Sequence, residues 1–121
     1  EKGLAEVILG YRRDPQVGPV VVLGVGGVLA EIYKDFAVRL APVGPEEAAR
    51  MIEEVRGLAL VRGYRGLPRG DTKALAAPVG AFSQLAFLEP RVAEAEMNPL
   101  IVRAEDHGVV AVDGLLVLSD N

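Results

Sequence analysis

The strongest constraint on the fold is an alternating stretch near the C-terminal end of the sequence. Two acids and an amide, Glu94, Glu96 and Asn98, alternate there with Ala95 and Met97. Because successive side chains of a β-strand point to opposite faces, a strand at this place has one oxygen-rich face and one apolar face. The pattern therefore predicts a strand with one face in the core and the other open to solvent or to a polar ligand.

A second strand is predicted over residues 109–118, after turn-type residues at 105–108, and it carries one carboxylate, Asp113, among aliphatic residues. In a hairpin of ordinary loop length, Asp113 falls opposite Asn98 or about two residues away, within same-face reach of Glu96. A lone charge in such a run is costly unless it is paired or metal-bound. We therefore predict that Glu96, Asn98 and Asp113 are magnesium ligands, completed by water and phosphate oxygens. The alternative is that they form the solvated face of an edge hairpin.

Composition limits the classes of partner. The 121 residues suffice for one domain with a hydrophobic core, and the lack of cysteine excludes disulfides and favours a reducing, cytoplasmic location. A net charge of -4 argues against nucleic acid as a partner. The longest apolar run, residues 19–32, is too short and too glycine-rich to span a membrane, so no membrane partner is expected either.

Basic residues are nonetheless clustered, at Arg12 and Arg13 and again at Arg62, Arg65 and Arg69. Local clusters on an acidic protein suit a small anionic ligand better than a polyanion. The sequence also begins without Met and almost directly in a predicted strand. We therefore expect these residues to be part of a longer chain.

The order of predicted elements indicates an α+β fold. Strands are expected at residues 4–9, 20–23, 28–32 and 36–40, with a polar turn at 11–19. A helix should begin at Pro45 and bury a stripe formed by Ala48, Ile52, Val55 and Ala59. After a glycine-rich loop at 62–70, Asp71 should cap a second helix, weakened by Pro78 and Gly80, whose buried residues are Leu75, Val79, Phe82 and Ala86. Two final strands follow, which predicts a mostly antiparallel sheet with both helices on one face.

The glycine-rich sequence Gly24-Val25-Gly26-Gly27 is not a dinucleotide-binding fingerprint, because Leu29 occupies the place of the third small residue and a strand is predicted to follow. Its glycines allow either a bend in the strand or close approach of the backbone to a ligand. The single histidine, His107, lies in a predicted turn, where we expect a surface position.

Taken together, several spaced motifs resemble the C-terminal lobe of the ATP-grasp domain in ADP-forming (NDP-forming) acyl-CoA synthetases. A similar domain occurs in the β subunit of succinyl-CoA synthetase. The motifs are the sequence from Glu6 to Glu31 with its R-R-D-P-Q-V-G-P and G-V-G-G-V segments, then Asp35, Arg39 and Pro42, the G-Y-R-G sequence at 63–66 with Asp71, and the E-A-E-M-N-P-L and A-V-D sequences near the end. The resemblance covers nearly all of residues 1–121, which it implies are a single subdomain of a larger ATP-grasp domain.

The resemblance implies an acid–CoA ligase in which a phosphoryl group passes between a phosphohistidine on another domain or subunit and ADP, with Mg²⁺ as cofactor and CoA bound on another domain. It matches Asn98 and Asp113 to the magnesium ligands and Glu96 to the acid that faces the phosphohistidine. It also gives Arg13 a catalytic and nucleotide-binding role. The remaining positions matched to the ATP/ADP cleft are Gly26, Gly27 and Glu31.

The family's N-terminal lobe, with a phosphate-contacting lysine and the adenine-binding hinge, has no counterpart in these residues. We therefore expect the fragment alone to be inactive and the full-length protein to be an oligomer. Three other interpretations remain open at this point. They are a regulatory ATP-grasp-like domain of a protein acetyltransferase, a lobe of another ATP-grasp carboxylate ligase, and an interaction domain with an acidic face.

Overall fold

The computed structural model describes residues 3–26, 35–63, 66, 68–88 and 90–119. The strands are β1 (Ala5–Asp14), β2 (Gly18–Val25), β3 (Phe36–Leu40), β4 (Val92–Val102), β5 (Val109–Ala111) and β6 (Gly114–Leu118). The helical elements are α2 (Pro45–Glu54), α3 (Ala76–Ser83) and three 3₁₀ segments, η1 (Arg56–Val61), η3 (Thr72–Leu75) and η4 (Gln84–Phe87).

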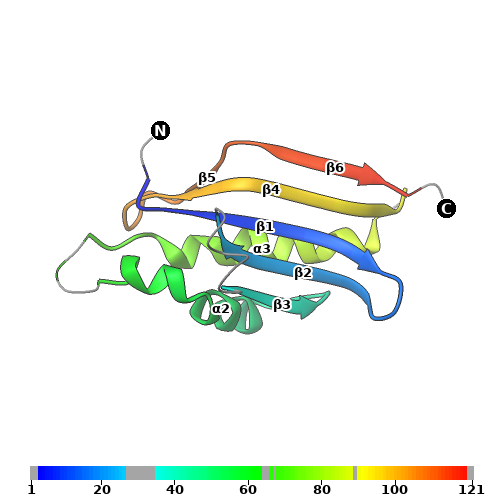
Figure 1. Ribbon diagram of the computed structural model, residues 1–121, viewed down its shortest axis with the longest axis horizontal. Helices are drawn as coiled ribbons and strands as arrows, with labels where there is room; N and C mark the ends of the chain where they lie inside the picture. Colours follow the sequence, from blue (N-terminus) through cyan, green and yellow to red (C-terminus); the bar gives the residue numbers. More distant parts are fainter. Residues whose placement is uncertain (1–2, 27–34, 64–65, 67, 89, 120–121) are drawn as a thin grey trace.

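The strands form one antiparallel sheet in the order β3-β2-β1-β4-β5, and β6 also pairs with β4. Figure 1 shows the helical elements together on one side of this sheet. A single buried cluster joins the two layers, with Val7, Leu9 and Leu23 from the sheet against Met51 and Leu75 from the helical layer. This arrangement confirms the predicted α+β fold with helices on one face. None of the helices in the described residues is long and apolar enough to cross a membrane.

The first hairpin is longer than predicted. Residues 11–19 were expected to form a turn, but β1 continues to Asp14 and β2 begins at Gly18. Tyr11, at 2% exposure, belongs to the core and keeps the strand regular at this point. The turn itself is closed by Asp14 Oδ1, which accepts hydrogen bonds from the N–H groups of Gln16 at 2.8 Å and Val17 at 3.1 Å. These bonds lower the pKa of Asp14.

The strand predicted over residues 28–32 lies outside the described residues. Where the described chain resumes, the buried Asp35 links the sheet to the helical layer. Its carboxylate accepts hydrogen bonds from the N–H groups of Arg56 at 2.6 Å and Gly57 at 2.7 Å. A Cβ at Gly57 would lie 2.5 Å from Val25, so this close approach requires glycine. Asp35 thereby fixes the beginning of η1 against the ends of β2 and β3.

The first helix begins at Pro45 as predicted, and Ala48, Ile52 and Val55 are buried. Ala59 is exposed, against expectation, because α2 ends at Glu54 and the chain continues as the 3₁₀ segment η1. A 3₁₀ turn has three residues rather than 3.6, so the buried stripe of α2 does not continue through η1 to Ala59.

The second helical element is composed of η3, α3 and η4, and Leu75, Val79 and Phe82 are buried as predicted. Asp71 precedes η3 but makes no side-chain cap. Its carboxylate instead accepts a hydrogen bond from the N–H of Gly108 at 2.8 Å. The predicted cap is therefore wrong, because Asp71 ties the start of the helical segment to the turn between β4 and β5.

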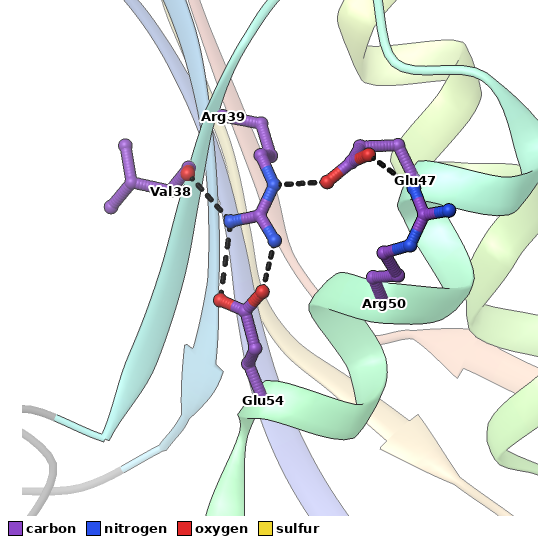
Figure 2. A network of polar contacts seen from close by, with 5 residues as sticks. All are labelled: Val38, Arg39, Glu47, Arg50 and Glu54. Carbon is purple, nitrogen blue, oxygen red and sulfur yellow. Dashed lines mark hydrogen bonds and ion pairs between the residues drawn. The ribbon is translucent and has the colours of Figure 1, made fainter.

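Arg39 of β3 connects the edge of the sheet to α2 through a network of ion pairs (Figure 2). Its guanidinium donates hydrogen bonds to Glu54 and to Glu47, and Arg50 donates a further bond of 2.7 Å to Glu47. The bonds from Arg39 lower the pKa values of both glutamates, and the bonds to Glu54 and Glu47 raise that of Arg39. Because the carboxylate pKa values are depressed on folding, their contribution to stability is complete above the ordinary value of 4.5 and is lost as the pH falls through the lower folded-state values.

We predict that Glu54→Gln lowers the stability by about 0.5 kcal/mol at neutral pH, the range of solvent-screened ion pairs. As the pH falls below the ordinary pKa of 4.5, wild type should lose this advantage and the two unfolding midpoints should converge. Thermal unfolding at several pH values measures both effects. Glu53→Gln, which changes an exposed acid on the same helix, is the control. A difference that grows in acid would contradict the assignment.

Candidate functional site

The face of the sheet away from the helices, which we call the open face, carries Arg12 of β1 and two acids of β4. Tyr11 and Ala95 are register partners and are both buried against the helical layer. Their neighbours therefore point the other way, so that Gly10 is opposite Glu96 and Arg12 is opposite Glu94. The predicted separation of an apolar face and an oxygen-rich face on residues 94–98 is confirmed for Glu94, Ala95 and Glu96.

A hollow of about 190 Å³ lies on the open face around Gly10. Arg12, Val22, Glu94 and Glu96 line it together with the backbone of the neighbouring positions. A Cβ built on Gly10 would find only the carbonyl oxygen of Ala95, at 3.9 Å. The space beside Glu96 is therefore left open by the lack of a side chain at Gly10.

A β-bulge separates Glu96 from the end of β4. Leu9 pairs with Met97 and Val7 with Leu100, so the single residue Ile8 faces both Asn98 and Pro99. Proline has no N–H to donate to the ladder, and a bulge is one of the few places where a sheet tolerates it.

Asn98 and Asp113 lie directly opposite each other, as predicted. The N–H of Asn98 donates a hydrogen bond of 3.2 Å to the carbonyl oxygen of Asp113, and Met97 pairs with Gly114 in the adjacent register position. Asp113 Oδ1 accepts a hydrogen bond of 2.8 Å from the N–H of Gly114. The hairpin thus brings the backbones of Asn98 and Asp113 together at one end of β6.

The premise that Asp113 is a buried charge is wrong. The predicted strand 109–118 is interrupted at residues 112–113, between β5 and β6, and Asp113 is exposed. All five residues of β6 are exposed as well, because β6 lies at the sheet's margin and no described element covers it. Asp113 is therefore available to a ligand and needs no metal to offset burial.

The donor set fits a hard cation that retains other ligands. Glu96, Asn98 and Asp113 offer two carboxylates and one amide oxygen, and within the described chain no hydrogen bond or ion pair engages the side chains of Glu96 or Asn98. The described residues contain no group of three or more His, Cys, Asp and Glu side chains able to hold a metal ion. A magnesium ion here would thus require the Asn98 amide together with phosphate and water oxygens, the coordination that magnesium commonly has in nucleotide sites.

Arg13 does not share the open face with Glu96. Arg13 lies two residues after Tyr11 in β1, so its side chain points to the same face as Tyr11. Its Nη2 donates a hydrogen bond of 2.6 Å to the carbonyl oxygen of Ala86 in η4. Its Nε is buried without a partner in the described structure. The arginine that lines the open-face hollow is Arg12, whose side chain is 66% exposed and 3.8 Å from Asp14. The signal missed in the sequence is Tyr11, a core aromatic that sets which of the two arginines faces outward.

Gly26, at the end of β2, donates a backbone hydrogen bond of 3.0 Å to the carbonyl oxygen of Glu6. It therefore lies towards the same end of β1 as Ile8 and the bulge that contains Asn98. Two other predicted nucleotide-binding residues, Gly27 and Glu31, fall outside the described residues.

Comparison with known proteins gives the family. An ATP-grasp domain model matches residues 1–118. The chain is 38% identical over 118 residues to acetate–CoA ligase [ADP-forming] I of Archaeoglobus fulgidus, a match that covers 98% of this chain and 17% of that protein. It is also 38% identical over 113 residues to the β subunit of acetate–CoA ligase [ADP-forming] I of Pyrococcus furiosus, with 93% of this chain and 48% of the subunit covered.

Solved structures agree with this result. Acetyl-coenzyme A synthetase 1 of Ca. Korarchaeum cryptofilum, determined with coenzyme A and Mg-AMPPCP, superimposes with a TM-score of 0.86 at 34% identity, over 98% of this chain and 55% of that one. PH1788 of Pyrococcus horikoshii superimposes with a TM-score of 0.89 at 30% identity, over 100% of this chain and 51% of that one. The chain thus spans about half the length of these relatives or less. It belongs to the ATP-grasp domain family, and its homologues are ADP-forming acyl-CoA synthetases.

Proposed function

We propose that this chain is the lobe of an ADP-forming acyl-CoA ligase that binds the magnesium–nucleotide complex. In the full-length protein it would exchange a phosphoryl group between a phosphohistidine and ADP. The observation that carries the proposal is the pairing of Asn98 with Asp113 at the end of a hairpin whose open face also presents Glu96. The Korarchaeum synthetase described above was solved with Mg-AMPPCP and with its phosphohistidine segment pointing towards the nucleotide-binding site, which supports the same use of this lobe.

Each residue of the hairpin has a separate task in this proposal. The side-chain oxygens of Asn98 and Asp113 would hold the metal, and a bound magnesium ion would neutralise phosphate charge and hold the phosphates in a fixed geometry. Glu96, two residues before Asn98 and on the lining of the hollow, would accept a hydrogen bond from the imidazole N–H of the incoming histidine and so orient its ring. Gly10 would leave room for these groups on the open face.

The two arginines would contribute differently. Arg12 lies on the open face and would supply positive charge near the phosphates, where phosphoryl transfer depends on electrostatic stabilisation. Arg13, which binds the Ala86 carbonyl in this structure, would act by holding the end of β1 against η4. We therefore propose Arg13 as a positioning residue in place of a direct catalytic one.

The proposed partner is the CoA-binding and phosphohistidine domain, either in the same polypeptide or as a separate subunit. The similar region is 17% of the Archaeoglobus ligase and 48% of the separate Pyrococcus β subunit. CoA would bind on that domain, and the full-length protein would be an oligomer. The lack of cysteine is consistent with a cytoplasmic enzyme. The relatives named above are ligases, which favours a catalytic role over a regulatory one.

In the full-length protein, we predict that Asn98→Ala and Asp113→Asn each lower magnesium-dependent transfer from phosphohistidine to ADP by about 100-fold, the size expected for loss of a metal ligand. Single-turnover loss of the phosphohistidine, followed against magnesium concentration, measures the effect. Asp106→Asn is the matched control, because Asp106 is an exposed aspartate in the turn of the same hairpin. Near wild-type rates in both site variants would rule out the assignment.

We predict that Gly10→Val raises the KM for ADP about tenfold, because the branched side chain would occupy the hollow beside Glu96. Valine favours strands, so the variant should fold. Gly10→Ala is the control, since its Cβ makes only an ordinary contact with Ala95. Equal KM values for the alanine and valine variants would show that this hollow does not receive the nucleotide.

The isolated 121 residues should catalyse no ATP- and CoA-dependent formation of acyl-CoA. Half or more of each of the two acetate–CoA ligase sequences lies outside the region of similarity, and the phosphohistidine and CoA contacts are proposed to lie there. A coupled assay of the isolated chain with acetate, ATP and CoA tests this expectation. Measurable turnover would contradict the proposal that the phosphohistidine and CoA contacts lie outside these 121 residues.

A further inference from the structure

A second hollow, of about 500 Å³, lies in the helical layer between α2 and the segment that begins with η3. Its walls come from α2, η3, the start of α3, and Arg62 and Arg69, which lie between η1 and η3. The helical layer covers the face of the sheet opposite to Glu96, so this hollow, which we call the helical cleft, is separate from the open-face site. The proposed nucleotide function makes no use of it.

The helical cleft gathers positive charge on an acidic protein. Arg62, Arg69 and Lys73 line it, and Glu53 is the single acid among the described lining residues, although acids outnumber bases 17 to 13 in the sequence. Two of these cations belong to clusters that the sequence alone marks as suited to a small anion, and the sheet site accounts for neither. A concave surface lined by like charges concentrates the field and attracts ions of opposite sign.

Arg62 is held in place before any ligand binds. Its Nε donates to the carbonyl oxygen of Leu58 at 3.4 Å and its Nη2 to that of Val55 at 3.3 Å, both in or next to η1. This leaves Nη1 and the remaining N–H of Nη2 as donors for a ligand. Arg69 lies at the exposed rim, 3.5 Å from Glu105, and Lys73 has no hydrogen bond or ion pair within the described chain.

The rest of the lining determines what kind of anion would fit. Ala49, Ile52 and Ala76 form an apolar wall, and Thr72 adds a hydroxyl beside Lys73. Donors of three kinds, a guanidinium, an ammonium and a hydroxyl, suit the three terminal oxygens of a phosphate better than a planar carboxylate. The volume is within the range of small-molecule sites, which combine an apolar wall with a few polar groups.

We infer that the helical cleft binds a small phosphate-bearing metabolite, with the phosphate between Arg62 and Lys73 and the apolar body against Ile52 and Ala76. Glu53 lies on the same lining and repels the anion, so it lowers the affinity of the site. Changes at Lys73 and Glu53 should therefore act in opposite directions. A merely structural role for these two exposed side chains predicts no such opposition.

The test is calorimetric titration of the full-length protein with AMP in the presence of EDTA, which removes the magnesium that the open-face site requires. Lys73→Gln should weaken AMP binding about tenfold through loss of one charge-assisted contact, and Glu53→Gln should strengthen it about threefold. Gly10→Val, which fills the open-face hollow whether or not magnesium is present, should leave this binding unchanged. Arg91→Gln, an exposed cation outside the lining of the cleft, is the matched charge control.

The inference is overturned if millimolar AMP gives no binding, or if Lys73→Gln has no greater effect than Arg91→Gln. It is also overturned if Glu53→Gln weakens binding. Loss of AMP binding in Gly10→Val alone would place the ligand in the open-face site. None of these outcomes bears on the magnesium-dependent transfer assay, so the two proposals can fail separately.

Discussion

The bulge at Asn98 and Pro99 is the feature on which both the core and the open face depend. Strict alternation along β4 would place Leu100 and Val102 on the same face as Glu96 and Asn98. The extra residue in the ladder reverses the alternation, so that Leu100 and Val102 are buried at 2% and 0% exposure. One strand can therefore present oxygen-bearing side chains on one side at its middle and still contribute core residues at its end. Pro99 suits this position because the bulge requires no donor there.

The features of the fold and the site that could be predicted are those that neighbouring residues in the sequence determine. The alternation of residues 94–98 and the length of the final turn predicted that Asn98 and Asp113 would be opposite each other, because hairpin register follows from turn length and strand period. The exposure of Asp113 was missed, since the aliphatic residues around it suggest burial. Burial requires a covering element, and the described chain places none over β6.

The partners of Arg13 and Asp71 were not predicted, for a related reason. The sequence around Arg13 contains Asp14, Pro15 and Gly18, which are typical of turns, and a residue in a predicted turn has no defined face. Because Tyr11 is buried and β1 continues past it, the side chain of Arg13 must lie on the same face of the sheet as Tyr11. Asp71 has the position of a helix cap, but its partner Gly108 is 37 residues away in the sequence. Local rules for capping cannot detect such a competitor for the carboxylate.

The two sides of the proposed magnesium site differ in how firmly the sheet holds them. β4 is paired with β1 on one side and with β5 and β6 on the other, so the backbone at Glu96 is fixed from both directions. Within the described chain β6 pairs only with β4, and its three leucines and Val117 are each 40% or more exposed. A ligand bound between Asn98 and Asp113, as proposed, would stabilise the weaker strand by connecting it to the stronger one. By linkage, whatever stabilises the pairing of β6 with β4 would also favour binding at this proposed site.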